Sequence, residues 1–216
     1  MYSLSIVTII VIAANAIITM KGLNDFGFFE RYKFNVGAIR RGEQLRMVSS
    51  GFLHVNFTHL FANMFTLYFF ANTVIFSVGA FKFLLIYFGS LLAGGLLSLY
   101  FHKEEYYYSA VGASGAVTGI LYSAIMFDPN MSLYLFLIPI PIPAYVFGIG
   151  YLLYSIYGMR KQLGNIGHDA HFGGAIGGYV LTLLFAPWLL QEHLLMVGLL
   201  AVPIVLLFIL QRQGKL

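Results

Sequence analysis

The stretch Gly112-Ala113-Ser114-Gly115 opens an uncharged segment that continues as AVTGILYSAIMF over residues 116–127. Just upstream, Tyr106-Tyr107-Tyr108-Ser109 is typical of the boundary between lipid and water. We therefore expect Ser114 near the start of a hydrophobic helix, inside the membrane. A single serine in such a helix usually bonds its own backbone or a neighbouring helix, so this motif alone does not indicate a function.

The composition of the whole chain is that of a membrane protein. Of its 216 residues, 60% are hydrophobic and only 9% are charged, whereas a soluble domain carries about 25% charged residues. Cysteine is absent, which excludes disulfides, thiolate catalysis and cysteine-based metal sites. The formal charge of +4 is too small and scattered to indicate nucleic-acid binding, and it fits loops beside anionic headgroups. We expect a multi-pass integral membrane protein whose first apolar segment is a permanent span.

Apolar stretches recur along the chain, and crossing the hydrocarbon core takes about 20 helical residues. The expected spans are 2–20, 51–78, 81–101, 109–127, 143–158, 170–188 and 193–210. Residues 21–50 differ, because charged and aromatic residues are mixed there, and we expect a partly helical amphipathic loop in the interface. Alternate prolines at Pro139, Pro141 and Pro143 exclude a regular helix over 131–143.

A few polar side chains lie within these apolar segments, where burial is costly and a functional role is the default hypothesis. They include His54, His59, Asn63 and His171. His59 and Asn63 are four residues apart and therefore share one helix face. Their donors could converge on one point, which is what a developing oxyanion requires. On an ideal helix His54 lies about 140° from His59, so we expect it to support the loop instead.

Glycines accompany both Ser114 and His171 on their helix faces: Gly115 and Gly119 beneath the serine, Gly174 and Gly178 beneath the histidine. Two glycine stripes that face each other let helices approach closely and would set His171 against Ser114. A serine hydroxyl becomes an effective nucleophile when an adjacent base takes its proton. A Ser–His pair with donors opposite is the minimal arrangement for acyl transfer.

Taken together, these motifs resemble those of the rhomboid intramembrane serine proteases. The matching motifs are His54-x4-His59-x3-Asn63, Gly112-Ala113-Ser114-Gly115 and Ala170-His171-x2-Gly174-x3-Gly178, on the second, fourth and sixth expected spans. The resemblance implies an all-α integral membrane fold. A six-helix catalytic bundle would occupy residues 1–190, loop 21–50 included, and an additional transmembrane helix with a short tail would occupy 191–216.

The resemblance also implies roles for individual residues. Ser114 and His171 would form a catalytic dyad, with His59 and Asn63 in an oxyanion hole beside the Ser114 backbone N–H. Arg46, eight residues before His54, would belong to the family's loop signature. Structural support would come from Arg46 and His54 together with Gly112, Gly115, Gly119, Gly174 and Gly178.

The implied activity is cleavage of transmembrane segments in other membrane proteins. Its partners would be those substrates and the lipid bilayer, with no nucleic acid, no metal and no other cofactor. The expected location is a prokaryotic plasma membrane. The alternative is a catalytically inactive rhomboid-like protein that binds membrane clients.

This sequence departs from the family pattern at several positions. The family often has tryptophan at position 45, where this chain has Leu45. It often has an aromatic residue four positions after the serine, stacked on the histidine, where this chain has Thr118. The orientation of His171 then depends on another group, or is looser. A seventh span occurs in only part of the family.

Two arguments about topology conflict. Loop 21–50 carries six of the twelve Lys and Arg residues, and the positive-inside rule would place it in the cytoplasm. The family topology places this loop, and the mouth of the active site, on the non-cytoplasmic side. We follow the family topology, because amphipathic interfacial loops blur the charge rule.

Asp169 is a tempting third member of a triad, but on a helix it points about 200° away from His171. We expect it to be an N-terminal cap instead. A further alternative is a zinc site built from His168, Asp169 and His171 with His54 and His59, which are suitable ligand types. Against that alternative, no helix carries the paired histidines and neighbouring glutamate of metalloproteases.

Overall fold

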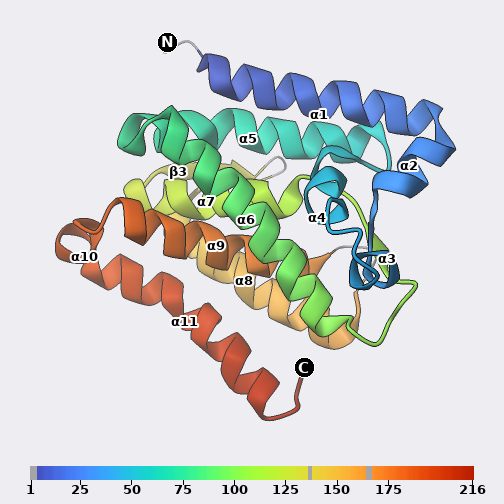
Figure 1. Cartoon of the computed structure of the whole chain (residues 1–216). Helices are drawn as coiled ribbons and strands as arrows, with labels where there is room; N and C mark the ends of the chain where they lie inside the picture. Colours follow the sequence, from blue (N-terminus) through green and yellow to red (C-terminus); the bar gives the residue numbers. More distant parts are fainter. Residues whose placement is uncertain (1–3, 136–137, 164–166) are drawn as a thin grey trace.

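The computed structural model describes residues 4–135, 138–163 and 167–216, and within them long helices dominate (Figure 1). The long helices are α1 (Ile6–Asn24), α5 (Phe57–Val78), α6 (Ala80–Phe101), α7 (Ser114–Phe127), α8 (Ala144–Lys161), α9 (His168–Phe185) and α11 (Leu194–Arg212). Each corresponds to one expected span. By length and apolar character, α1, α5, α6 and α11 can each cross a membrane, while α7 is apolar but shorter. The all-α membrane fold class is confirmed.

The expected start of the second span is wrong by six residues. Helix α5 begins at Phe57, because the side chain of Asn56 caps it and accepts the His59 backbone N–H at 2.8 Å. His54 therefore lies in the connection before the helix, and the argument from its helical angle does not apply. Residues 2–3 of the first expected span lie outside the described residues.

The fourth and sixth spans also begin elsewhere than expected. Ser109–Ala110 form a short strand, β2, so that α7 starts at Ser114 itself. Helix α9 starts at His168, two residues before the expected Ala170. Between the fifth and sixth expected spans, residues 164–166 lie outside the described residues.

Helix α7 is the centre of the molecule. Figure 1 shows it behind α6 and between α5 and α9, and every residue from Gly115 to Met126 is buried. Helix α1 joins this bundle from outside, where the side-chain amide of Asn15 donates to the Tyr87 hydroxyl on α6 at 3.3 Å. An uncharged helix with no exposed face needs small residues, and α7 supplies them as glycine, alanine and serine.

The loop after α1 is partly helical, as expected. It comprises α2 (Phe26–Tyr32), β1 (Phe34–Asn35), α3 (Val36–Arg40), α4 (Arg46–Ser49) and the 3-10 turn η1 (Ser50–Phe52). Strand β1 pairs antiparallel with β2, Phe34 opposite Ala110 and Asn35 opposite Ser109. The loop is therefore bonded directly to the segment that leads into Ser114.

The proline-rich stretch forms an antiparallel hairpin and not a regular helix. Its strands are β3 (Ser132–Leu135) and β4 (Ile138–Pro143), with Ser132 opposite Pro143. Beyond α9, the short α10 (Leu189–Glu192) leads to α11 at the edge of the bundle (Figure 1). The Tyr179 hydroxyl of α9 donates to the Val197 carbonyl at 3.0 Å, which ties α11 to the bundle.

Candidate active site

Ser114 is the first residue of α7, and a turn at Gly112 delivers it there. Gly112 has φ of +133°, a conformation that other residues rarely adopt. A Cβ at Gly112 would lie 2.9 Å from Nε2 of His59 and 3.7 Å from the Ser114 hydroxyl oxygen. The imidazole of His59 and the Ser114 hydroxyl therefore border the same small space.

A chain of hydrogen bonds holds the backbone just before Ser114. The Ala113 N–H donates to His54 Nε2 at 3.3 Å, and His54 Nδ1 lies 2.8 Å from the Thr19 hydroxyl. Since an N–H can only donate, Nε2 is the acceptor and Nδ1–H donates to Thr19. The Thr19 hydroxyl then donates to the Phe52 carbonyl at 3.0 Å.

Through these bonds His54 supports the backbone of Ala113, next to Ser114. It does so without sharing a helix face with His59. The Gly112 N–H adds a second anchor by donating to the Ser50 carbonyl at 3.0 Å. Thr19 was missed by the sequence argument. It is a buried hydroxyl in a mostly apolar helix, which could have drawn attention to it.

His59 and Asn63 lie together at the start of α5. One N–H of the Asn63 carboxamide donates to the His59 carbonyl at 2.9 Å, which leaves its second N–H for another acceptor. The His59 ring meets His54 edge to face, with centroids 4.9 Å apart. Nδ1 of His59 is buried with no hydrogen-bond partner in the described chain.

The glycine stripes of α7 and α9 face each other. A Cβ at Gly174 would lie 2.0 Å from the Gly115 carbonyl oxygen, and one at Gly178 would lie 2.2 Å from that of Gly119. One turn closer to the start of α9, the Ala170 carbonyl oxygen would lie 3.2 Å from a Cβ at Gly115. Because Ser114 precedes Gly115 and His171 follows Ala170, this backbone contact brings the serine and the histidine to the same end of the helix pair.

His171 has a partner on a third helix. Its Nδ1 lies 2.7 Å from the hydroxyl of Tyr151 on α8. Among the described residues, Ser114 and His171 are not joined by a hydrogen bond. Catalytic hydrogen bonds are often long without substrate and tighten only in the Michaelis complex. Tyr151 belongs to none of the sequence motifs, and nothing in its own segment distinguished it.

The capping role expected for Asp169 is wrong. Gly167 occupies the N-cap position of α9, and Asp169 lies inside the first turn. Its carboxylate faces His102 at the end of α6, with Oδ2 and Nε2 3.5 Å apart. The side chain is thus engaged away from His171.

The connection after α6 is held by the same contact. Burial alone would lower the pKa of His102, but Asp169 and Glu105 together raise it above its ordinary value. The Tyr108 ring stacks on His102, with centroids 3.6 Å apart, and burial followed by the charges of Asp169 and Glu105 raises the Tyr108 pKa. The cluster ties residues 102–108, which lead toward Ser114, to the start of α9.

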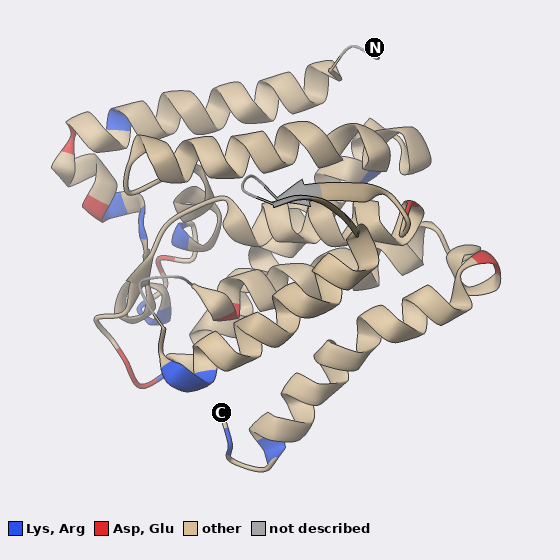
Figure 2. Ribbon diagram, turned by 180° about the vertical axis from the view of Figure 1, so that it is seen from behind, with Lys and Arg blue, Asp and Glu red and all other residues tan. Residues whose placement is uncertain are grey.

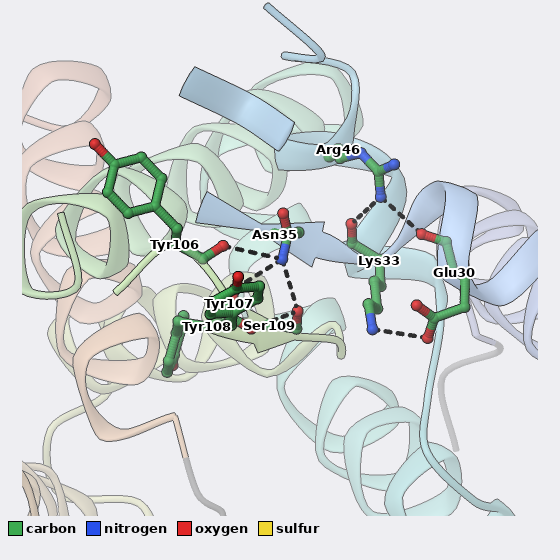
Figure 3. A network of polar contacts seen from close by, with 8 residues as sticks. All are labelled: Glu30, Lys33, Asn35, Arg46, Tyr106, Tyr107, Tyr108 and Ser109. Atoms are coloured by element: carbon green, nitrogen blue, oxygen red, sulfur yellow. Dashed lines mark hydrogen bonds and ion pairs between the residues drawn. The ribbon is translucent and has the colours of Figure 1, made fainter. Parts of the chain in front are cut away.

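Arg46 contacts several parts of the loop that follows α1. Figure 3 shows its guanidinium between α2 and the following strand, where it donates to the carbonyls of Glu30 at 2.8 Å and Lys33 at 3.0 Å. It also pairs with the Glu43 carboxylate at 2.8 Å. Arg46 therefore holds the parts of this loop together.

Asn35 fastens this loop to the segment before Ser114. Its side-chain amide donates to the Ser109 hydroxyl at 3.1 Å and to the Tyr106 and Tyr108 carbonyls at 3.4 Å (Figure 3). The same side chain accepts the Ala38 N–H at 2.8 Å, which starts α3. One asparagine thus links the loop's fold to the entrance of α7.

The zinc alternative is not supported by the arrangement of its residues. In the described parts of the chain, no group of three or more histidine, aspartate or glutamate side chains is placed to hold a metal ion. The His168 ring packs instead on Gly158 of α8, where an added Cβ would lie 2.3 Å from Nε2.

The fold and this polar centre define a class: a multi-pass helical membrane protein with serine and histidine at the same end of two packed helices. The chain belongs to the rhomboid family. The family model described as the rhomboid domain matches residues 41–188, which include all the site residues on α5, α7 and α9. Helix α11 lies beyond the matched region.

Named relatives agree with this membership. Rhomboid protein 1, mitochondrial, of Saccharomyces cerevisiae is 30% identical over 138 residues, covering 62% of this chain and 40% of that protein. RHOMBOID-like protein 12, mitochondrial, of Arabidopsis thaliana is 26% identical over 183 residues, covering 77% and 54%. Rhomboid protease GluP of Bacillus subtilis is 31% identical over 141 residues, covering 65% and 26%. The chain thus spans about half, or less, of each relative's length.

Proposed function

We propose that this protein is an intramembrane serine endopeptidase that cleaves transmembrane segments with Ser114 and His171. The observation that supports the proposal is the backbone contact between Gly115 and Ala170, which are the chain neighbours of Ser114 and His171. His59 borders the same space from α5. Nucleophile, base and donor thus come from three packed helices.

The start of α7 supplies a further donor. Ser114 is the first helical residue, so its backbone N–H has no acceptor within the helix. That N–H points to where negative charge is favoured, at the positive end of the helix dipole. Together with His59 and Asn63 it would hold the oxyanion of a tetrahedral intermediate.

The reaction then follows the general serine-hydrolase sequence. Ser114 attacks the scissile carbonyl while His171 takes its proton. His171 next gives that proton to the leaving amine, and water hydrolyses the acyl-enzyme. A substrate helix must first unwind locally, because its peptide bonds are otherwise occupied by helical hydrogen bonds. Residues that weaken a helix should therefore favour cleavage.

The names of the relatives support a protease and bear on the location. One of them carries the name rhomboid protease, from Bacillus subtilis, and two carry mitochondrial names. We place this protein in a prokaryotic plasma membrane, with the active-site mouth on the non-cytoplasmic side. The transmembrane substrates themselves are defined only by class.

The test compares wild type with Ser114→Ala on a transmembrane model substrate in liposomes, with a chelator in parallel. We expect chelator-resistant cleavage by wild type and none by Ser114→Ala. A serine-reactive fluorophosphonate should label wild type alone. Cleavage that survives the substitution would discard the dyad.

A second candidate is a rhomboid-like protein that binds membrane clients without cutting them. The observation that favours it is the absence of a hydrogen bond between Ser114 and His171 in the described chain. Co-purification of intact transmembrane substrates, with neither cleavage nor fluorophosphonate labelling across several substrates, would support this candidate.

A further inference from the structure

The hydroxyl of Tyr151 contacts one of the two ring nitrogens of His171. It lies 2.7 Å from Nδ1, and the two rings are nearly parallel, 23° apart, with centroids separated by 6.1 Å. Tyr151 comes from α8, whereas Ser114 comes from α7 and His171 from α9. The imidazole is therefore approached from both neighbouring helices, with Nδ1 on the α8 side.

The position of α8 beside the histidine is well defined. The Tyr122 hydroxyl of α7 donates to the Gly148 carbonyl of α8 at 2.8 Å. Phe147, which precedes Gly148, stacks on Tyr151 with centroids 5.9 Å apart, and the interplanar angle is 13°. The Tyr151 ring is thus held between Phe147 and His171.

The position of the proton on the neutral His171 ring follows from which ring nitrogen must act as an acceptor. For His171 to take the proton of Ser114, the nitrogen facing the serine must be an unprotonated acceptor. With Nδ1 engaged by Tyr151, that nitrogen is Nε2, so the neutral ring carries its proton on Nδ1. Nδ1–H then donates to the Tyr151 oxygen, and the hydroxyl proton of Tyr151 remains free for another acceptor.

Thr118 is a polar neighbour of Tyr151. It lies one turn after Ser114 on α7, and its side chain interacts electrostatically with that of Tyr151. A threonine at this position also leaves room for a tyrosine arriving from α8. Tyr151 is therefore close to the same helix that carries the nucleophile.

We infer that Tyr151 is the positioning residue for His171: it orients the imidazole and keeps the proton on Nδ1, so that Nε2 faces Ser114. The inference rests on the proposed protease function, since it assigns His171 the role of base. Thr118 stands where the family often has an aromatic residue that stacks on the histidine. In this protein the aromatic group that orients the histidine comes from a different helix. Tyr151 acts through His171 and does not touch the substrate.

The kinetic test uses Tyr151→Phe, which keeps the ring, with Tyr154→Phe as the matched control on the same helix. Tyr154 packs edge to face on His168 through its ring, which phenylalanine preserves. We expect kcat of Tyr151→Phe to fall about tenfold, the worth of one net hydrogen bond, with KM unchanged. Tyr154→Phe should match wild type. An active wild type whose Tyr151→Phe variant has the same kcat would overturn the inference.

The second measurement does not depend on activity. Protein carrying Ser114→Ala is labelled with [15N]histidine, and His171 is assigned by comparison with the same protein carrying His171→Gln. We expect nitrogen shifts of an Nδ1–H tautomer for His171, and a shift toward Nε2–H when Tyr151→Phe is added. An unchanged tautomer would overturn the inference. If the tautomer responds but Ser114→Ala still cleaves, the proposed function fails while the Tyr151–His171 contact stands.

Discussion

Thr19 lies at the far end of a relay that begins at the backbone of Ala113. The Ala113 N–H donates one hydrogen bond, and the His54 ring and the Thr19 hydroxyl each accept one and donate one, so all three groups are satisfied. Inside a protein an unpaired N–H costs more than the bond itself contributes. A hydroxyl on the first helix therefore helps to fix the turn that presents Ser114.

Replacing Thr19 with valine should weaken both the fold and the site. Valine has a similar shape but neither accepts the His54 Nδ1–H nor donates to the Phe52 carbonyl. We expect Thr19→Val to lower the free energy of unfolding by about 1–3 kcal/mol and to reduce the cleavage rate. Thermal unfolding in detergent and the liposome cleavage assay measure the two effects.

The matched control is Thr19→Ser, which keeps the hydroxyl and loses only a methyl group. It should remain close to wild type in both assays. If serine and valine at this position behave alike, the hydroxyl has no part in holding the turn.

At the scale of elements, the contact between α7 and α9 decides the geometry of the site. Gly174 and Gly178 rest directly on the carbonyls of Gly115 and Gly119. Carbonyl oxygens are rigid, so a side chain added here cannot be accommodated by a rotamer change. Ser90 of α6 also reaches this contact, since a Cβ at Gly119 would lie 2.0 Å from its hydroxyl oxygen.

Gly174→Ala should push α9 away from α7 and separate His171 from Ser114. The added Cβ would lie 2.0 Å from the Gly115 carbonyl oxygen, and overpacking of this kind costs about 1–3 kcal/mol. We expect a lower unfolding temperature and a loss of cleavage larger than the loss of stability alone would give. Both are measured on the purified protein.

Gly150→Ala is the control, because nothing lies within 4 Å of the Cβ it would add to α8. Alanine is favoured over glycine in a helix by about 0.5–1 kcal/mol, so this variant should be as stable as wild type or slightly more so. If Gly174→Ala is as stable and as active as Gly150→Ala, the α7–α9 contact does not set the geometry of the site.

At the scale of the whole molecule, charge is concentrated at one end. Figure 2 shows most Lys and Arg residues around α2, α3 and α4 and near the ends of α8 and α11. Lys82 is at the opposite end, in the first turn of α6. The site lies at the charged end, because α7 begins there with Ser114.

Single cysteine substitutions can report the orientation of the protein in the membrane, because the chain has no cysteine of its own. Glu104 and Asn130 are both exposed and lie in the connections before and after α7. In intact cells we expect an impermeant maleimide to label Glu104→Cys, on the non-cytoplasmic side, and to leave Asn130→Cys unlabelled until the membrane is opened. The reverse pattern would mean that the positive-inside rule governs this protein.

The sequence by itself determined the helical membrane class, the number and rough extent of the apolar segments, and the motifs that show the family. These follow from properties each segment carries alone: apolar length, glycine spacing and the prolines over 131–143. Helix starts were less predictable, since Asn56 as a cap and β2 before Ser114 depend on local bonds that hydropathy does not register.

Only the tertiary structure decided which side chains meet. It paired Asp169 with His102 and not with a helix end, placed Thr19 beneath His54, and set Tyr151 on His171. These partners are 67, 35 and 20 residues apart in the chain. Their meeting depends on how helices pack and rotate against one another, and packing is a property of pairs of surfaces that no single segment contains.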